Sequence, residues 1–303
     1  MTDAITREEK LMKAIATGSP SNIKPITREE MFLAKAGGQD VETPEPITRR
    51  EKLLQGIIDN GGGGGDVQDV LDGIISNKLG GGISSNVERV GYYALYECRE
   101  LTSANLPNVK TIMSNAFGYC TKLKNVYMPN VESIGVYGFV MTSELESVDM
   151  PKVTKLEGNA FSSSGIKSVN VPLLTTMGSA VFKSCRNLEK VELPLVATDL
   201  PSETFNFCSN LKTVILPLVK RLMSSSFKDN TKLDTLVLGS ETVCTLFNVN
   251  AFQGTPFAIG GTGGTAYVPQ ALIEEYKIET NWSTLYEAGT VTFVAKEGSE
   301  YDV

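Results

Sequence analysis

The feature that most constrains the fold of this chain is an apolar pattern that recurs every 21 to 23 residues. Each unit reads L-x-x-L-x-L with conservative replacements, and the units start at Leu101, Leu123, Leu145, Ile166, Leu188, Leu211 and Leu233. Proline follows in six of the seven units, at Pro107, Pro129, Pro151, Pro172, Pro194 and Pro217. A phenylalanine comes late in each unit, at Phe117, Phe139, Phe161, Phe182, Phe205, Phe227 and Phe252. A unit this short cannot bury its own apolar face, so the pattern predicts a solenoid whose stacked coils share one core.

The order of residue types within a unit predicts a short strand followed by turns. In the second unit the residues alternate, so Val126 and Met128 should point inward and Tyr127 outward. The proline that follows ends the strand, because it has no N–H to donate to the next coil. The stretch from Val131 to Ile134 then turns the chain, and Phe139 enters the interior. Parallel strands in register would build one long sheet over ladders of leucine, valine and phenylalanine.

The strand positions that should face solvent form a row across this sheet. They are Asn105, Tyr127, Asp149, Asn170, Glu192, Ile215 and Val237. The first five are polar or aromatic, and we take them as the candidate binding row for a glycan or a protein surface. The alternative is a solvated sheet face that binds nothing.

Cysteine usage agrees with a packed interior. Four of the five cysteines, Cys98, Cys120, Cys185 and Cys208, recur at one position just before the strand. A thiol there is most simply a small buried hydrophobe, and disulfides are not expected.

Units of the form C-x-x-L-x-x-V-x-x-P-x-V-x-x-I-x-x-x-A-F resemble the BspA-type (Treponema pallidum-like) leucine-rich repeats of bacterial surface and secreted proteins. The segment Ala251 to Leu285 resembles the C-terminal cap of that family, with a YVP sequence, a short helix containing Tyr276 and Lys277, and Asn281–Trp282. The resemblance implies an α+β repeat protein: a leucine-rich-repeat solenoid with a parallel sheet over residues 83–255, closed by a cap and tail over 256–303. Trp282 is then expected to plug the open core of the last coil.

A second repeat occupies residues 1–60, in three copies that begin ITREEKLM at Ile5, ITREEMFL at Ile26 and ITRREKLL at Ile47. Thr6 is placed to cap a helix and Glu9 to complete a capping box, as are their equivalents in the other copies. The predicted helices are short, and isolated helices below about 12 to 15 residues are marginal in water, so their apolar stripes need a partner surface. The predicted anchoring residues are Ile5, Leu11, Ile15, Ile26, Met31, Phe32, Ile47, Leu53, Leu54 and Ile57. Repeated anchors would raise avidity for a repetitive partner; the alternative is a three-helix bundle, or helices that fold back on the solenoid.

The glycine run Gly61–Gly65 marks a linker between the two arrays. Residues 66–82 follow as one more short amphipathic helix, expected either to cap the first coil or to help chains associate. The fold expected for the whole chain is therefore a solenoid preceded by short tethered α-helices.

Composition excludes several classes of function. The net charge of −7 disfavours nucleic acid. No apolar run is long enough to insert into a membrane, and the charged N-terminus does not read as a secretory signal. Histidine is absent, which removes the commonest general base and metal ligand. We expect no catalytic residues, no metal and no cofactor.

The I-T-R-x-E helices ahead of a glycine-rich tether are similar to the N-termini of structural proteins from phages and prophages of gut Firmicutes. That resemblance implies a virion fibre, decoration or appendage protein, made in the host cytoplasm without a signal peptide. Its helices would dock on a capsid or other virion protein, and its solenoid would bind a host-surface protein or glycan. The oligomeric state is left open, and a homo-oligomer such as a trimer is one possibility. The first alternative is a bacterial cell-surface adhesin built on leucine-rich repeats, and the second is an intracellular scaffold whose helices dock on a cytoplasmic assembly.

Overall fold

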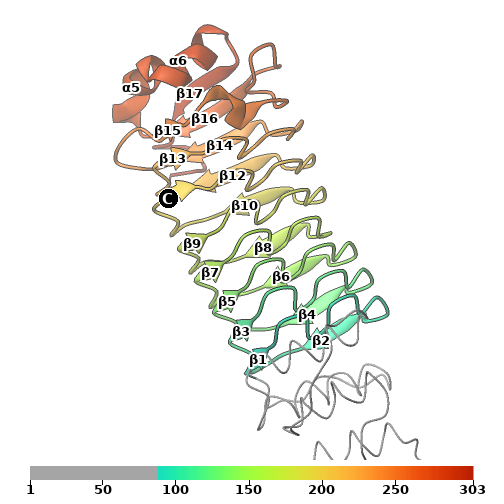
Figure 1. The fold of residues 1–303 in the computed structure, drawn as a ribbon. Helices are drawn as coiled ribbons and strands as arrows, with labels where there is room; N and C mark the ends of the chain where they lie inside the picture. The colour runs from blue at the N-terminus through green and yellow to red at the C-terminus, as the bar shows by residue number, and fades with distance from the viewer. Residues whose placement is uncertain (1–87, 303) are drawn as a thin grey trace, which may run out of the picture.

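The computed structural model describes residues 88–302, which wind into a solenoid with a helical cap at its C-terminal end (Figure 1). The solenoid predicted from the repeats is therefore confirmed. The predicted helices of residues 1–60 with their ten anchoring residues, the glycine linker 61–65, the helix of residues 66–82 and residues 83–87 of the first coil lie outside the described residues.

One side of the solenoid carries strands of three or four residues, one per coil. These are β2 (Ser103–Asn105), β4 (Asn125–Tyr127), β6 (Ser147–Asp149), β8 (Ser168–Asn170), β10 (Lys190–Glu192), β12 (Thr213–Leu216) and β14 (Thr235–Leu238). They pair in parallel in two sheets, β2-β4-β6-β8 and β10-β12-β14, and the second sheet continues with β16 (Gly264–Val268) and β17 (Val291–Ala295). Val126 and Met128 are buried and Tyr127 is exposed, as the alternation predicts.

A second side carries strands of two residues each, which the sequence did not reveal. They are β1 (Arg89–Val90), β3 (Thr111–Ile112), β5 (Ser133–Ile134), β7 (Lys155–Leu156), β9 (Thr176–Met177), β11 (Asp199–Leu200), β13 (Arg221–Leu222) and β15 (Thr245–Leu246). They pair in parallel as β1-β3-β5-β7-β9 and β11-β13-β15. The expectation of a single long sheet was therefore wrong. The stretch from Val131 to Ile134 does turn the chain, but its last two residues also pair with both neighbouring coils.

Both sides are interrupted near the middle of the solenoid because two coils differ in length from the others. Five positions separate Phe161 from Ile166, whereas six separate Phe139 from Leu145. The missing residue is accommodated by Gly165, since a Cβ there would lie 2.1 Å from the carbonyl oxygen of Ser143. In the next coil four positions separate Val196 from Leu200, against three for Val153 to Leu156.

The third side of each coil is the segment around the phenylalanine, which we call the turn side. Its backbone bonds to the next coil at every second residue: the N–H groups of Asn115, Phe117 and Tyr119 donate to carbonyl oxygens one coil on, at 2.8 to 2.9 Å. Two residues of each such segment before that of Phe252 have positive φ, as at Asn115 (59°) and Tyr119 (60°). These left-handed residues bend the segment around the phenylalanine.

The core is the predicted ladder of side chains. The seven phenylalanines stack coil over coil with ring centroids 4.8 to 5.9 Å apart and ring planes within 13° of parallel. All seven are fully buried. The recurring cysteines are free thiols, and the Cys120 thiol donates to the carbonyl oxygen of Leu95 at 2.9 Å.

The cap closes the last coil. It comprises η1 (Val249–Phe252), β16 (Gly264–Val268), η2 (Gln270–Leu272), α5 (Ile273–Ile278), α6 (Thr280–Glu287) and β17 (Val291–Ala295). Trp282 is fully buried against Phe252, and its Nε1–H donates to the carbonyl oxygen of Cys244 at 2.7 Å. The hydroxyl of Tyr276 accepts from the N–H of Cys244, and the side-chain amide of Asn281 donates to the carbonyl oxygen of Leu246. Cap side chains thus satisfy backbone groups of edge strand β15 and of Cys244 directly before it, and the predicted role of Trp282 is confirmed.

Candidate ligand-binding surfaces

The five residues of the candidate binding row lie side by side on the outer face of the longer strands. Residues Asn105, Tyr127, Asp149 and Asn170 occupy equivalent positions on β2, β4, β6 and β8, and Glu192 holds that position on β10. All five side chains are exposed. Tyr127 is the most prominent, with 59% of its surface accessible. We call this surface the sheet face.

The sheet face is polar and partly pre-ordered. The Asn170 amide donates to the Asp149 carboxylate at 2.8 Å, which fixes both side chains across neighbouring coils. A second outward column, Ser103, Asn125, Ser147 and Ser168, runs beside the first. Together the two columns offer an aromatic ring, hydroxyls, amides and a carboxylate to a ligand.

Ile215 and Val237 do not extend this face, contrary to the sequence prediction. Only 4% of Ile215 and 2% of Val237 is accessible. Val237 pairs in register with Tyr267 of β16, and the ring of Tyr301 lies 4.7 Å from that of Tyr267. The C-terminal tail therefore returns over this end of the sheet. The open part of the sheet face ends at β10.

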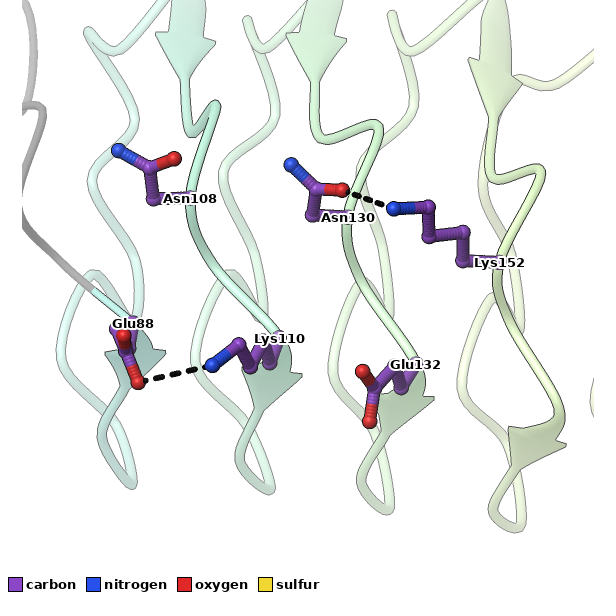
Figure 2. Close-up of a pocket in the computed structure, with 6 residues that line it drawn as sticks. All are labelled: Glu88, Asn108, Lys110, Asn130, Glu132 and Lys152. Carbon is purple, nitrogen blue, oxygen red and sulfur yellow. Dashed lines mark hydrogen bonds and ion pairs between the residues drawn. The ribbon is translucent and has the colours of Figure 1, made fainter.

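A polar hollow of about 450 Å³ lies between the two strand-bearing sides of the first coils (Figure 2). Six residues line it: Glu88, Asn108, Lys110, Asn130, Glu132 and Lys152. Asn108, Asn130 and Lys152 each directly follow the proline that recurs in the coils, and Glu88, Lys110 and Glu132 each directly precede a short strand. We call it the corner hollow.

Hydrogen bonds and an ion pair fix several side chains of the corner hollow, and charged groups remain accessible to a ligand. Lys110 forms an ion pair with Glu88 at 3.3 Å, and Lys152 donates to the Asn130 side-chain oxygen at 2.6 Å. The Asn130 amide in turn donates to the carbonyl oxygen of Pro107 at 2.7 Å. Within residues 88–302, the side-chain carboxylate of Glu132 has no ion-pair or hydrogen-bond partner, and only its backbone is hydrogen-bonded (Figure 2). The hollow can therefore offer a carboxylate and an ammonium group to a polar ligand.

Sequence reasoning found the sheet face but missed the corner hollow. The sheet face follows from alternation within one strand. The hollow appears only when residues one coil apart are aligned, which brings Asn108 beside Asn130 and Lys152, and Glu88 beside Lys110 and Glu132. The repeat spacing in the sequence is sufficient to make that alignment, so the hollow could have been predicted.

The described residues show no arrangement typical of a catalytic or metal centre. No group of three or more cysteine, aspartate or glutamate side chains in residues 88–302 could hold a metal ion. The buried cysteines are poor nucleophiles, because burial raises the pKa of the Cys185 thiol to about 12 and that of Cys244 further. In the same range, none of the helices has both the length and the apolar character needed to cross a bilayer. The absence of enzymatic activity stays a prediction.

Comparison with known families agrees with this architecture. The sequence profile of the BspA type leucine rich repeat region matches in six copies, over residues 82–167 and 132–257. These ranges overlap and together span more than half of the 303 residues. The chain is a BspA-type leucine-rich repeat protein.

Solved structures of other leucine-rich repeat proteins match this BspA-type chain over more than half of its length. A leucine-rich repeat protein of T. pallidum is 23% identical with a TM-score of 0.48, over 64% of this chain and 87% of that protein. A leucine-rich cell surface protein of Faecalibacterium prausnitzii is 18% identical with a TM-score of 0.28, over 55% and 67%. One from Bacteroides ovatus is 18% identical with a TM-score of 0.25, over 70% and 83%. A search of curated proteins found no match to the chain.

Proposed function

We propose that this BspA-type protein is a non-enzymatic binding protein that attaches to a ligand on a biological surface through the sheet face of β2 to β10 and the adjoining corner hollow. The setting we propose is the surface of a bacterial cell, where the protein acts as an adhesin. The observation that carries the proposal is the continuous exposed row from Asn105 to Glu192, which spans five successive coils.

The chemistry of the two surfaces supports binding rather than catalysis. The interior is filled with apolar side chains, while outward positions are free to vary from coil to coil. Tyr127 provides an exposed aromatic anchor in the middle of the polar row, and tyrosine is a residue type that commonly dominates binding energy. The Asp149–Asn170 pair and the charges of the corner hollow flank it and would set orientation.

Attachment to a virion is the function predicted from residues 1–60. That prediction depends on anchoring helices outside the described residues, and neither the solenoid nor the family supports it. Mass spectrometry of purified phage particles would test it separately. The chain should be found in those particles if it is a virion component.

The proposed binding role can be tested on an array that carries glycans and extracellular proteins. The purified full chain, labelled with a fluorophore, should bind a subset of the printed molecules. A Tyr127→Ala/Asp149→Ala variant should weaken that binding about tenfold or more, since it removes an aromatic anchor and its polar neighbour.

The matched control is Lys155→Ala/Thr176→Ala, which removes two outward side chains from the second strand-bearing side. It should bind like the unmodified chain. Equal loss of binding in both double variants would mean that the sheet face is not the binding surface, and that result would overturn the proposal.

A further inference from the structure

The turn side of the first three coils carries a cluster of aromatic side chains that the proposed function does not use. We call it the tyrosine patch, and it consists of Tyr92, Tyr93, Tyr96, Tyr119, Tyr137 and Met141. Four of these side chains are substantially exposed, with accessible fractions of 37% for Tyr92 and Tyr93, 41% for Tyr137 and 40% for Met141. The turn side is separate from both strand-bearing sides, so the patch is distinct from the sheet face and from the corner hollow.

The patch places bulky residues where the backbone disfavours them. Tyr93, Tyr119, Tyr137 and Met141 all have φ between 57° and 60°. Such left-handed positions suit asparagine, aspartate or glycine far better than an aromatic residue. Of the other ten left-handed non-glycine positions in residues 88–302, nine hold small or polar residues, such as Asn115, Asn159 and Ser163, and the tenth is Phe207. In the first coils, large side chains therefore occupy strained backbone positions and are exposed to solvent. Packing in the core does not explain this choice of residues, because these side chains are not in the core.

Three of the rings of the patch, those of Tyr93, Tyr96 and Tyr119, contact one another in a defined arrangement. Tyr96 lies edge-on to Tyr93 at 5.3 Å and to Tyr119 at 5.4 Å between ring centroids. The ring of Tyr96 covers Gly118 of the next coil, where an added Cβ would lie 2.9 Å from the ring carbon Cδ2. Gly118 thus provides the space in which this ring lies against the coil. The result is a pre-ordered aromatic surface that extends along the solenoid axis.

The size of the patch favours a small ligand over a protein partner. Four side chains exposed to about 40% of the roughly 150 to 250 Å² that an aromatic residue can bury give about 300 Å². A stable protein interface buries about 800 Å² per partner. An oligosaccharide of a few units needs much less, and it can lie along several coils.

The chemistry of the patch favours a neutral, hydroxyl-rich ligand. A tyrosine ring packs against apolar C–H groups while its hydroxyl bonds to polar edges, and a pyranose presents both. Asn115 holds in the second coil the position that Tyr93 holds in the first and Tyr137 in the third, and it adds an amide to the patch. Arg99 is already engaged with Glu97 at 3.7 Å, and the patch itself contains no basic residue. A phosphate or sulfate group would therefore meet no free cation there.

We propose that the tyrosine patch is a second binding site, which takes a neutral linear oligosaccharide stacked across the first three described coils. It is independent of the sheet face. Loss of the oligosaccharide site would leave the proposed function intact, and loss of sheet-face binding would leave this site intact.

The site can be tested by saturation-transfer-difference NMR on the full chain. The probes are cellohexaose, mannohexaose, maltohexaose and N-acetylchitohexaose, each at millimolar concentration. We expect transfer to the ring protons of at least one of them. The variant Tyr93→Asn/Tyr119→Asn/Tyr137→Asn should bind that probe about tenfold more weakly or worse. Asparagine already occupies this type of position at Asn115 and Asn159, so the variant should fold and its melting temperature should not fall.

The matched control is Phe207→Asn. Phe207 is an aromatic residue with positive φ in the same row as Tyr119, is 42% exposed, and lies outside the patch. Its variant should bind the probe like the unmodified chain. No transfer to any of the four probes, or equal affinity in the folded triple variant, would overturn the proposal. A change of oligomeric state in the triple variant, seen as a shifted elution volume without loss of a bound sugar, would also overturn it, because the patch would then be a contact between copies.

Discussion

Replacing Phe161 by alanine probes the feature on which the whole solenoid depends. Its ring lies in the middle of the phenylalanine stack, 5.2 Å from the ring of Phe139 and 5.9 Å from that of Phe182. The side chain is completely buried. The substitution would therefore leave a cavity between two coils and remove the ring contacts to both neighbours.

The expected cost can be worked from these contacts. Truncating a buried phenylalanine to alanine costs about 3 to 5 kcal/mol through lost transfer energy and the remaining cavity. Each ring pair contributes about 0.5 to 1.5 kcal/mol beyond burial, so the loss of two pairs places the value at the upper end of that range. For a domain of this size about 1 kcal/mol corresponds to roughly 2 to 4 °C, which predicts a fall in melting temperature of about 10 °C or more.

Thermal and urea unfolding followed by circular dichroism would measure the effect. Phe161→Leu should cost less, because Leu95 holds the equivalent position in the first described coil. Phe207→Ala is the control: its side chain is exposed, so its stability should stay within about 0.5 kcal/mol of the unmodified chain. A Phe161→Ala variant that melts at the temperature of this control would refute the shared stacked core.

Three further predictions concern the cap, the shortened coil and the buried thiols. Trp282→Phe should cost about 1 to 3 kcal/mol in urea unfolding, because it leaves the carbonyl oxygen of Cys244 buried without its donor; an unchanged midpoint would show that this hydrogen bond is unimportant. Gly165→Ala should lower the yield of folded protein or cost at least about 1 to 3 kcal/mol, since its Cβ would clash with the backbone of Ser143; wild-type stability would contradict that geometry. Burial raises the pKa of Cys185 from 9.0 to about 12, so the stability that depends on its neutral thiol is complete below pH 9 and is lost as the pH rises towards 12. Mass spectrometry after treatment with a thiol reagent at pH 8 should find Cys185 unmodified in the folded chain, and rapid modification there would count against its burial.

The interior of this protein could be predicted from the sequence because its apolar residues recur at a constant spacing. Leucine, valine and phenylalanine columns follow from that spacing alone, and the cap was recognisable from Tyr276 and the Asn281–Trp282 pair. The second strand-bearing side was missed because its strands are only two residues long. A stretch such as Val131 to Ile134 shows no alternation that would distinguish a strand from a turn. Strand β17 was missed for a different reason, namely that η2, α5 and α6 separate it in the sequence from its partner β16.

The surface was harder to predict, because it depends on contacts between coils and on the returning tail. Ile215 and Val237 occupy outward strand positions and are buried beside Tyr267 of β16, on which the tail residue Tyr301 packs. The corner hollow and the tyrosine patch each combine residues one coil apart, which a unit read by itself does not bring together. The strained positions of Tyr93 and Tyr137 become visible only in the backbone.

The distribution of these surfaces along the axis limits where recognition can take place. The last coils are covered on the sheet side by the tail and closed at the end by α5, α6 and β17 (Figure 1). The corner hollow and the tyrosine patch lie in the first coils, and the open sheet face ends at Glu192. A ligand that contacts more than one of these surfaces must therefore approach the first coils, because only there do the sheet face, the hollow and the turn side all carry exposed side chains of distinct chemistry. The C-terminal coils then serve to support and terminate the stack, and substitutions there should change stability before they change binding.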